Sequence, residues 1–201
     1  STGNVADYDV PDGPLTDMGK RQAQDLARVL RESPPTHIFA SPLLRALETA
    51  SAIAAECGRL IEVWKDLYEI RDLGRYVGPS VDELRRQFPV AEFGDELEAD
   101  GWIYDGRETL EQAYKRGQRV LAKLKATFGP EDRVLIVAHA GFNKMLLMNL
   151  LNIPLNTDIY LNQANCCLNH LRIEGERIWV GSVNDTSHLR LEDTNISAAL
   201  G

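Results

Sequence analysis

A histidine that follows an apolar run is the first candidate for chemistry in this chain. Residues 134–138 are apolar, His139 ends the run, and apolar residues recur with helical spacing over 145–151. This pattern predicts a buried parallel strand that carries His139 at its carboxyl end, followed by a helix. Open α/β sheets bind ligands at that edge, and the free N–H groups of a helix N-terminus favour an anion. The sequence therefore places His139 where an α/β protein would act on a negatively charged group.

Two more polar groups follow predicted strands. Arg45 lies in a predicted helix just after the strand over 37–40, and a guanidinium there can bind two phosphate oxygens at once. Glu69 follows the short strand over 61–64, where a carboxyl group beside an apolar wall can act as a general acid. Taken singly, each has a commoner interpretation as a solvated or ion-paired surface residue.

Together, the three residues meet the needs of phosphoryl transfer. That reaction requires positive charge on the equatorial oxygens, an acid for the leaving oxygen and a nucleophile in line with it. If the three strands are parallel neighbours, Arg45, Glu69 and His139 converge on one edge of the sheet. The combination predicts a phosphate site there.

The elements that must position these residues alternate between strands and helices. Thr16 is the expected N-cap of the first helix, and Ser41 that of the second, with Pro42 at its first position. The alternation predicts a three-layer α/β/α sandwich with a mostly parallel central sheet. The predicted elements are helices over 16–32, 41–57, 81–88 and 108–128, strands over 37–40, 61–64 and 134–138, and a hairpin of 166–173 with 177–183.

Composition limits the partners of the chain. With 201 residues the chain suits one α/β domain, and its net charge of -8 argues against nucleic acid or an anionic membrane surface as the main partner. A small phosphorylated substrate is compatible with that charge, because a cationic pocket can lie in an acidic protein. The three cysteines lack metal-ligand spacing, and we expect no metal and no cofactor. Reduced cysteines and the absence of a signal peptide favour a cytoplasmic protein.

Six segments, in order, resemble motifs of the histidine phosphatase (phosphoglycerate mutase-like) superfamily, and of its phosphatase branch in particular. They are residues 14–19 (PLTDMG), 41–50 (SPLLRALETA), 67–78 (LYEIRDLGRYVG), 106–109 (GRET), 137–141 (VAHAG) and 184–189 (NDTSHL). The resemblance covers nearly the whole chain. It implies a single histidine phosphatase-like domain over residues 1–201, with a phosphoglycerate mutase-like fold. It also implies a phosphomonoester hydrolase that acts through a phosphohistidine.

The resemblance assigns roles residue by residue. It implies that Asn4, Arg45, His139 and the backbone N–H of Ala140 contact the phosphate. His139 would stabilise the phosphoryl group in transfer rather than attack it. Glu69 would protonate the leaving oxygen and then activate water.

One motif of the family has no counterpart in residues 1–201. The Arg-His-Gly motif, which supplies the nucleophilic histidine and the first arginine, is absent, while Ser1–Asn4 resembles the residues that follow it. We therefore expect the motif, and the mid-sheet strand that carries it, upstream of Ser1. Of the other histidines, His37 begins a strand, His170 lies in the hairpin, and His188 suits a structural hydrogen bond. None replaces the nucleophile.

Two other functions remain open. A phosphoglycerate mutase-type phosphotransferase belongs to the same family, although the chain is short for one and residues 70–105 offer few basic groups. An inactive protein that binds a phosphorylated ligand is the second alternative. Trp102, Ile103 and Tyr104 suit either the wall of the substrate pocket or the core. Family members are often dimers, which leaves a homodimer open.

Overall fold

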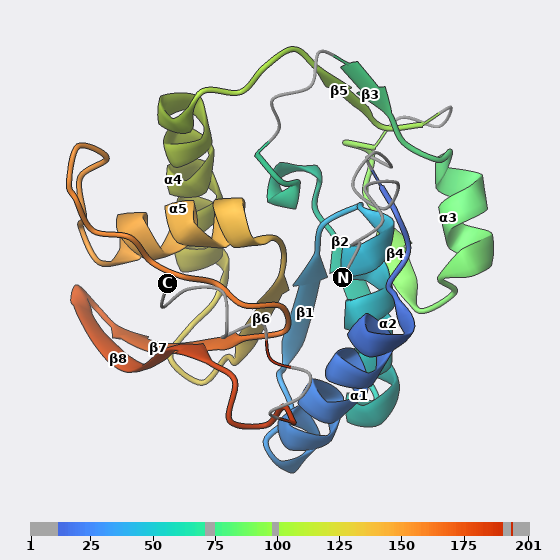
Figure 1. The fold of residues 1–201 in the computed structure, drawn as a ribbon, viewed down its shortest axis with the longest axis horizontal. Helices are drawn as coiled ribbons and strands as arrows, with labels where there is room; N and C mark the ends of the chain where they lie inside the picture. The colour runs from blue at the N-terminus through green and yellow to red at the C-terminus, as the bar shows by residue number, and fades with distance from the viewer. Residues whose placement is uncertain (1–11, 71–74, 98–100, 191–193, 195–201) are drawn as a thin grey trace, which may run out of the picture.

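A parallel sheet forms the middle layer of the computed structural model, which describes residues 12–70, 75–97, 101–190 and 194 (Figure 1). The strand order is β4-β2-β1-β6, and all three pairings are parallel. All four strands therefore end at the same edge. The strands are β1 (His37–Ala40), β2 (Ile61–Val63), β4 (Ala91–Phe93) and β6 (Val134–Val137).

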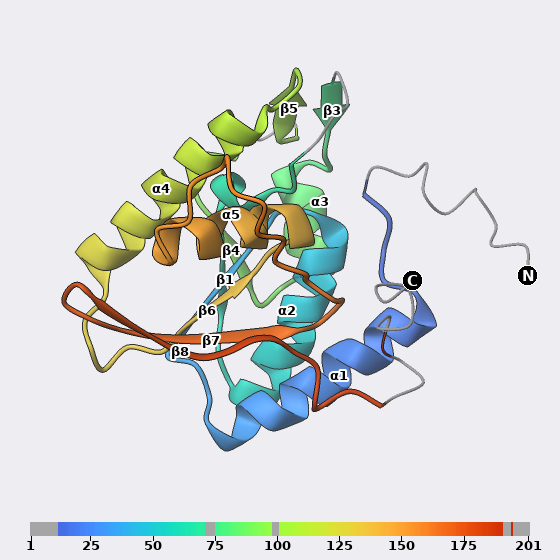
Figure 2. The ribbon, with the colours of Figure 1, turned by 60° about the vertical axis from the view of Figure 1, so that its left-hand side comes forward.

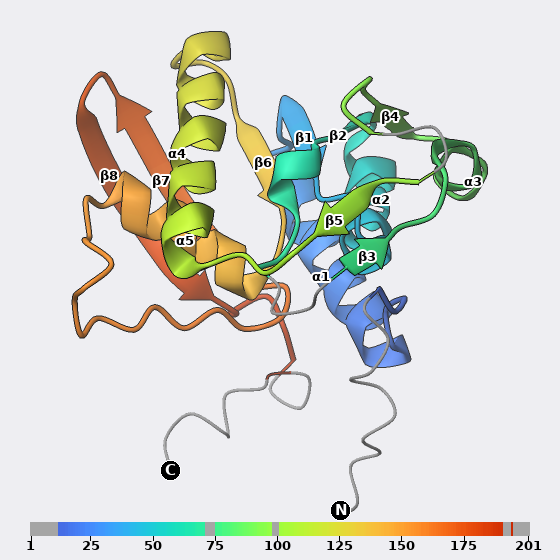
Figure 3. The ribbon, with the colours of Figure 1, turned by 90° about the horizontal axis from the view of Figure 1, so that it is seen from above.

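Helices cover both faces of this sheet (Figures 2 and 3). On one face, α1 (Asp17–Glu32) and α2 (Leu44–Cys57) pack in an apolar cluster with Ile38 and Ala40 of β1. On the other, α4 (Leu110–Thr127) and α5 (Ala140–Leu150) pack around Phe39. Successive residues of a strand point to opposite faces, so β1 contributes to both cores. The predicted three-layer α/β/α sandwich is confirmed.

The segment between β2 and α4 contains more regular structure than its sequence indicates. The helix expected over 81–88 is present, but the segment also supplies β4, which pairs with β2 at the edge of the main sheet. These strands of three residues are too short to show a period of two. The elements of the segment are the 3-10 helix η2 (Lys65–Leu67), β3 (Arg75–Val77), α3 (Val81–Gln87), β4 and β5 (Ile103–Asp105), with β3 and β5 paired antiparallel.

The predicted hairpin is also present, as β7 (Leu168–Glu174) and β8 (Arg177–Asp185). It forms a sheet of its own on the side of β6 away from β1 (Figures 1 and 3). Within the described ranges no strand pairs with that second edge of β6. The mid-sheet strand expected upstream of Ser1 stays a prediction. Among the described residues, no helix combines the length and apolar character needed to span a bilayer.

The two adjacent cysteines precede the hairpin instead of lying within it. Cys166 has a φ of 53° in the left-handed region, and β7 begins only at Leu168. The expected strand over both cysteines is therefore wrong by two residues. Burial raises the pKa of the thiol of Cys166, and that of Cys167, to about 11. Both cysteines are free thiols.

We expect Cys166 and Cys167 to resist alkylation in the folded protein. With a pKa of about 11, only about one thiol in a thousand is ionised at pH 8, and the thiolate is the nucleophile. Mass spectrometry after iodoacetamide treatment should find both unmodified at pH 8, and alkylation should become faster as the pH rises towards 11. Urea-unfolded protein is the control and should react fully. Rapid labelling of either cysteine in the folded protein at pH 8 would contradict this.

Candidate active site

The ends of β1, β2 and β6 bring the predicted site residues to one edge of the sheet. Beyond the paired strands, the N–H of Ser41 donates to the carbonyl of Val137 at 3.0 Å, and that of Trp64 donates to the carbonyl of Ala40 at 3.0 Å. These bonds keep the three chain segments together past the last strand residue. Arg45 is the second residue of α2 and therefore lies in the first turn of that helix, at the same edge. Asn4 lies outside the described residues.

His139 is fixed by a hydrogen bond to a neighbouring strand end. It occupies the N-cap position of α5, and its side chain is buried. The ring Nε2 lies 2.8 Å from the hydroxyl oxygen of Ser41, which directly follows β1. The parallel pairing of β1 with β6 sets Ala40 opposite Val137, so Ser41 and His139 both follow closely on neighbouring strand ends. The contact sets the orientation of the imidazole at the sheet edge.

This contact corrects the expected role of Ser41. The helix α2 begins at Leu44 rather than at residue 42, and its N-cap, Leu43, makes no side-chain capping bond. Ser41 accepts from the N–H of Leu43 at 3.3 Å and bonds to His139, and its hydroxyl has enough donor and acceptor positions for both. The carboxylate of Asp12 caps α2 instead, accepting from the N–H of Leu44 at 2.6 Å.

Asp12 also links the N-terminus of α2 to strand β3. Its second oxygen accepts a hydrogen bond from the hydroxyl of Tyr76 in β3 at 2.8 Å. The carboxylate therefore joins the chain before α1, the start of α2 and β3 in a buried position. Sequence reasoning missed this residue. No local pattern marks Asp12 as a helix cap, because the helix that it caps begins 32 positions later.

Glu69 lies on the N-terminus of α5. Its Oε2 accepts from the N–H of Gly141 at 3.1 Å, and its Oε1 accepts from that of Phe142 at 3.0 Å. A third bond, from the N–H of Ile70 to Oε1, measures 2.8 Å. The first residues of a helix lack intrahelical acceptors for their N–H groups, and the helix dipole favours a negative group there. Glu69 and His139 are therefore neighbours, because the helix that Glu69 caps begins directly after His139.

Gly141 makes this approach possible. A Cβ atom at position 141 would lie 2.6 Å from Oε1 of Glu69, which is closer than real contacts of this kind. Glycine thus permits the carboxylate to reach the backbone of α5. The sequence analysis quoted Gly141 only as part of a motif and gave it no role.

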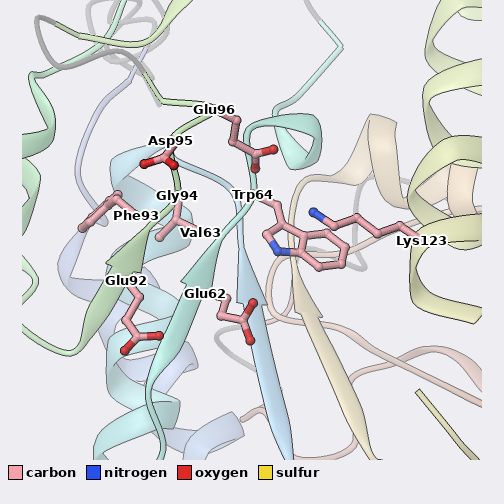
Figure 4. Close-up of a pocket in the computed structure, with 9 residues that line it drawn as sticks. All are labelled: Glu62, Val63, Trp64, Glu92, Phe93, Gly94, Asp95, Glu96 and Lys123. Carbon is pink, nitrogen blue, oxygen red and sulfur yellow. The ribbon is translucent and has the colours of Figure 1, made fainter. Parts of the chain in front are cut away.

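A hollow beside the carboxyl ends of β2 and β4 is separate from the predicted site and has the wrong charge for a phosphate. It has a volume of about 360 Å³ beside β2 and β4 (Figure 4) and holds none of the predicted site residues. Its one lysine, Lys123, places Nζ 3.9 Å from the centre of the Trp64 ring. Four carboxylates make the pocket acidic. Its lining residues are Glu62, Val63, Trp64, Glu92, Phe93, Gly94, Asp95, Glu96 and Lys123.

Three other residues named from the sequence make packing contacts or a structural hydrogen bond. Trp102 is buried in the core against Tyr76, which favours its packing role over the pocket wall. His188 bonds through Nε2 to the carbonyl of Cys166 at 3.0 Å, as expected of a structural histidine. His37 packs its ring against Phe128, at the far end of β1. Within the described ranges, no group of His, Cys, Asp and Glu side chains could hold a metal ion.

Comparison with known proteins identifies the family. The sequence model of the histidine phosphatase superfamily (branch 1) matches residues 4–186. The chain belongs to this superfamily. The match spans every element from α1 to β8 and therefore includes all three strand ends described above.

Within the histidine phosphatase superfamily, the relatives carry both mutase and phosphatase names. The chain is 33% identical over 189 residues to a probable phosphoglycerate mutase GpmB of Enterobacter, covering 89% of this chain and 84% of that protein. It is 31% identical over 181 residues to an uncharacterized phosphatase PhoE of Bacillus subtilis, covering 89% and 85%. A mycobacterial glucosyl-3-phosphoglycerate phosphatase shares the fold, with a TM-score of 0.63 at 24% identity over 87% of this chain and 89% of that one.

We expect Gly141→Ala to displace Glu69 without unfolding the protein. The new methyl group would overlap Oε1, and a carboxylate at the end of a flexible side chain moves more easily than helix backbone. Alanine is also favoured over glycine inside a helix by about 1 kcal/mol, so α5 should persist. A crystal structure should show the Glu69 carboxylate moved off the N–H groups of residues 141 and 142, and thermal unfolding should stay cooperative.

The matched control is Gly129→Ala, where the nearest atom to a new Cβ is 3.9 Å away. That substitution should leave Glu69 in place. A Gly141→Ala structure in which Glu69 still accepts both hydrogen bonds would contradict the steric argument.

Proposed function

We propose that this protein is a phosphomonoester hydrolase that works through a phosphohistidine intermediate. The observation that carries the proposal is the proximity of His139 to the Glu69 carboxylate at the N-terminus of α5. Arg45, in the first turn of α2 at the same sheet edge, adds a positive charge. An imidazole, a carboxyl group and a guanidinium are the groups that hydrolysis of a phosphate ester requires.

In the proposed reaction, a histidine nitrogen attacks phosphorus while the bond from phosphorus to the leaving oxygen breaks. Arg45, His139 and the N–H of Ala140 stabilise the equatorial oxygens, and Asn4 is proposed to add a further contact. Glu69 gives its proton to the leaving oxygen. In the second step, Glu69 takes a proton from water, the water oxygen bonds to phosphorus, and the bond to histidine breaks.

The two oxygens of Glu69 are not equivalent for this task. Oε1 accepts two backbone N–H groups, whereas Oε2 accepts only that of Gly141. A carboxyl oxygen has two lone-pair positions, so Oε2 retains one for a proton. We infer that Oε2 is the oxygen that carries the proton to the leaving group.

The proposal needs a nucleophilic histidine on a segment that precedes Ser1. Each histidine other than His139 has a structural position: His37 begins β1 and packs on Phe128, His170 pairs within the β7–β8 hairpin, and His188 bonds to the carbonyl of Cys166. The second edge of β6 is without a strand partner in the described part of the chain, and β6 leads directly to His139. A parallel strand paired there would deliver its own last residue to the same sheet edge.

We further propose a small phosphorylated substrate, a cytoplasmic location and neither nucleic acid nor a membrane as partner. The net charge of -8 and three free cysteines support these points. A homodimer remains an open alternative to a monomer. The mutase names among the relatives keep the phosphotransferase as a second candidate, which differs from a hydrolase in requiring a bisphosphate primer.

A phosphoryl adduct tests the proposed function directly. The protein expressed from its complete reading frame is mixed briefly with an aryl phosphate and denatured at high pH, because phosphohistidine is acid-labile. An intact-mass spectrum should show one transient phosphoryl group and continued release of inorganic phosphate. Turnover only with a bisphosphate primer would favour the mutase, and binding of phosphate without adduct or turnover would indicate an inactive binding protein.

We expect His139→Ala to lower turnover of an aryl phosphate by at least about tenfold, since loss of one electrostatic stabiliser of a transition state costs about 10²–10³. The comparison is of initial rates for the complete protein. His170→Ala, in the hairpin, is the control and should retain full activity. Unchanged turnover in His139→Ala would refute the assigned role.

A further inference from the structure

A buried arginine lies directly beneath the loop that carries Glu69. Arg116, in α4, is 1% exposed and faces the protein interior. Its Nε and Nη2 donate to the two carboxylate oxygens of Glu108, at 2.8 and 2.6 Å. Its Nη1 donates to the carbonyls of Asp66 and Tyr68, at 2.7 and 2.9 Å. Every nitrogen of the guanidinium is thus engaged, and two of the four bonds hold the backbone just before Glu69.

The same guanidinium is stacked between two rings that belong to the site. Its central carbon lies 3.7 Å from the ring centre of Tyr68 and 3.9 Å from that of Phe142. Tyr68 directly precedes Glu69, and the N–H of Phe142 donates to Oε1 of Glu69. Arg116 therefore contacts the residue next to the carboxyl group and the residue that binds that carboxyl group.

Glu108 completes this arrangement. Its side chain is 8% exposed, and its Oε1 also accepts from the hydroxyl of Tyr68 at 3.3 Å. A buried ion pair adds little net stability compared with well-packed apolar side chains. Its hydrogen bonds are directional, however, and a planar guanidinium with a bidentate partner sets both position and orientation.

We propose that Arg116 and Glu108 are positioning residues for the general acid Glu69. They fix the Tyr68 backbone and the Phe142 ring relative to each other, and thereby hold the Glu69 carboxyl on the N-terminus of α5 beside His139. The inference rests on the proposed function, in which Glu69 protonates the leaving oxygen. Neither residue touches the reacting atoms.

Substrates with different leaving groups distinguish a positioning role for Arg116 and Glu108 from a general structural role. An alkoxide leaves only with a proton, so hydrolysis of an alkyl phosphate depends on the acid. A dinitrophenolate leaves as a stable anion and does not need one. Displacement of Glu69 should therefore slow the alkyl ester far more than the dinitrophenyl ester, whereas general damage to the site slows both.

The experiment compares kcat/KM for glycerol phosphate and 2,4-dinitrophenyl phosphate in the complete protein. This ratio reports the first phosphoryl transfer, before the water step in which Glu69 acts again. In Arg116→Lys, which keeps the charge but loses the planar fork, we expect kcat/KM for glycerol phosphate to fall by about tenfold to a hundredfold. For dinitrophenyl phosphate it should fall by less than about threefold. Glu108→Gln should show the same selectivity.

The controls distinguish failure of the inference from failure of the proposed function. Glu69→Gln must itself slow the alkyl ester selectively, and if it does not, the proposed role of Glu69 is wrong. Lys115→Met removes the exposed ion pair with Glu111 on the same helix and should leave kcat/KM unchanged for both substrates. If Glu69→Gln is selective but Arg116→Lys and Glu108→Gln affect both esters equally or neither, the positioning role is overturned. It is also overturned if neither of these two variants folds, since the pair is then structural.

Discussion

The carboxylate of Glu69 on the N-terminus of α5 is the interaction on which the arrangement of the site depends. It joins the loop after β2 to the helix after β6, two segments separated by more than 70 positions in the chain. The N–H groups that it satisfies are the ones that helix geometry leaves without partners. Gly141 permits this approach, because a Cβ atom there would lie only 2.6 Å from Oε1 of Glu69. His139 is the N-cap residue of α5, so only one residue of the chain separates it from Gly141, whose N–H binds this carboxylate.

The N-terminus of a second helix at the same edge is also capped by a carboxylate. The N-terminus of α2 is capped by Asp12, and that of α5 by Glu69, so each helix receives its carboxylate from a distant part of the chain. This leaves Ser41 available to orient His139. Each cap also neutralises part of the positive potential of its helix dipole. The positive charge for a phosphate must therefore come mainly from side chains, which is the role proposed for Arg45.

The sequence predicts the elements whose signals are local, and fails where the partner is distant. The apolar run before His139, the capping threonine of α1 and the glycine turn of the hairpin each lie within a few residues of the element they define. Ser41 before a proline looks like a helix cap, but its partner is 98 positions away. Arg116 follows Lys115 in a charged helix, and nothing local shows that it turns inward to the backbone of residues about 50 positions earlier.

The shared N-terminus of α5 also constrains how the proposed reaction can proceed. Glu69 takes the N–H groups of the second and third residues of the helix, so only that of Ala140, at the first position, is left for a phosphate. A phosphate bound there would lie next to the Glu69 carboxylate, and two negative groups at one helix end repel each other. A proton on Oε2 relieves that repulsion and is the proton that the leaving oxygen requires. In the proposed mechanism, transfer of that proton requires the Glu69 carboxyl to stay beside the substrate, which is the role proposed for Arg116 and Glu108.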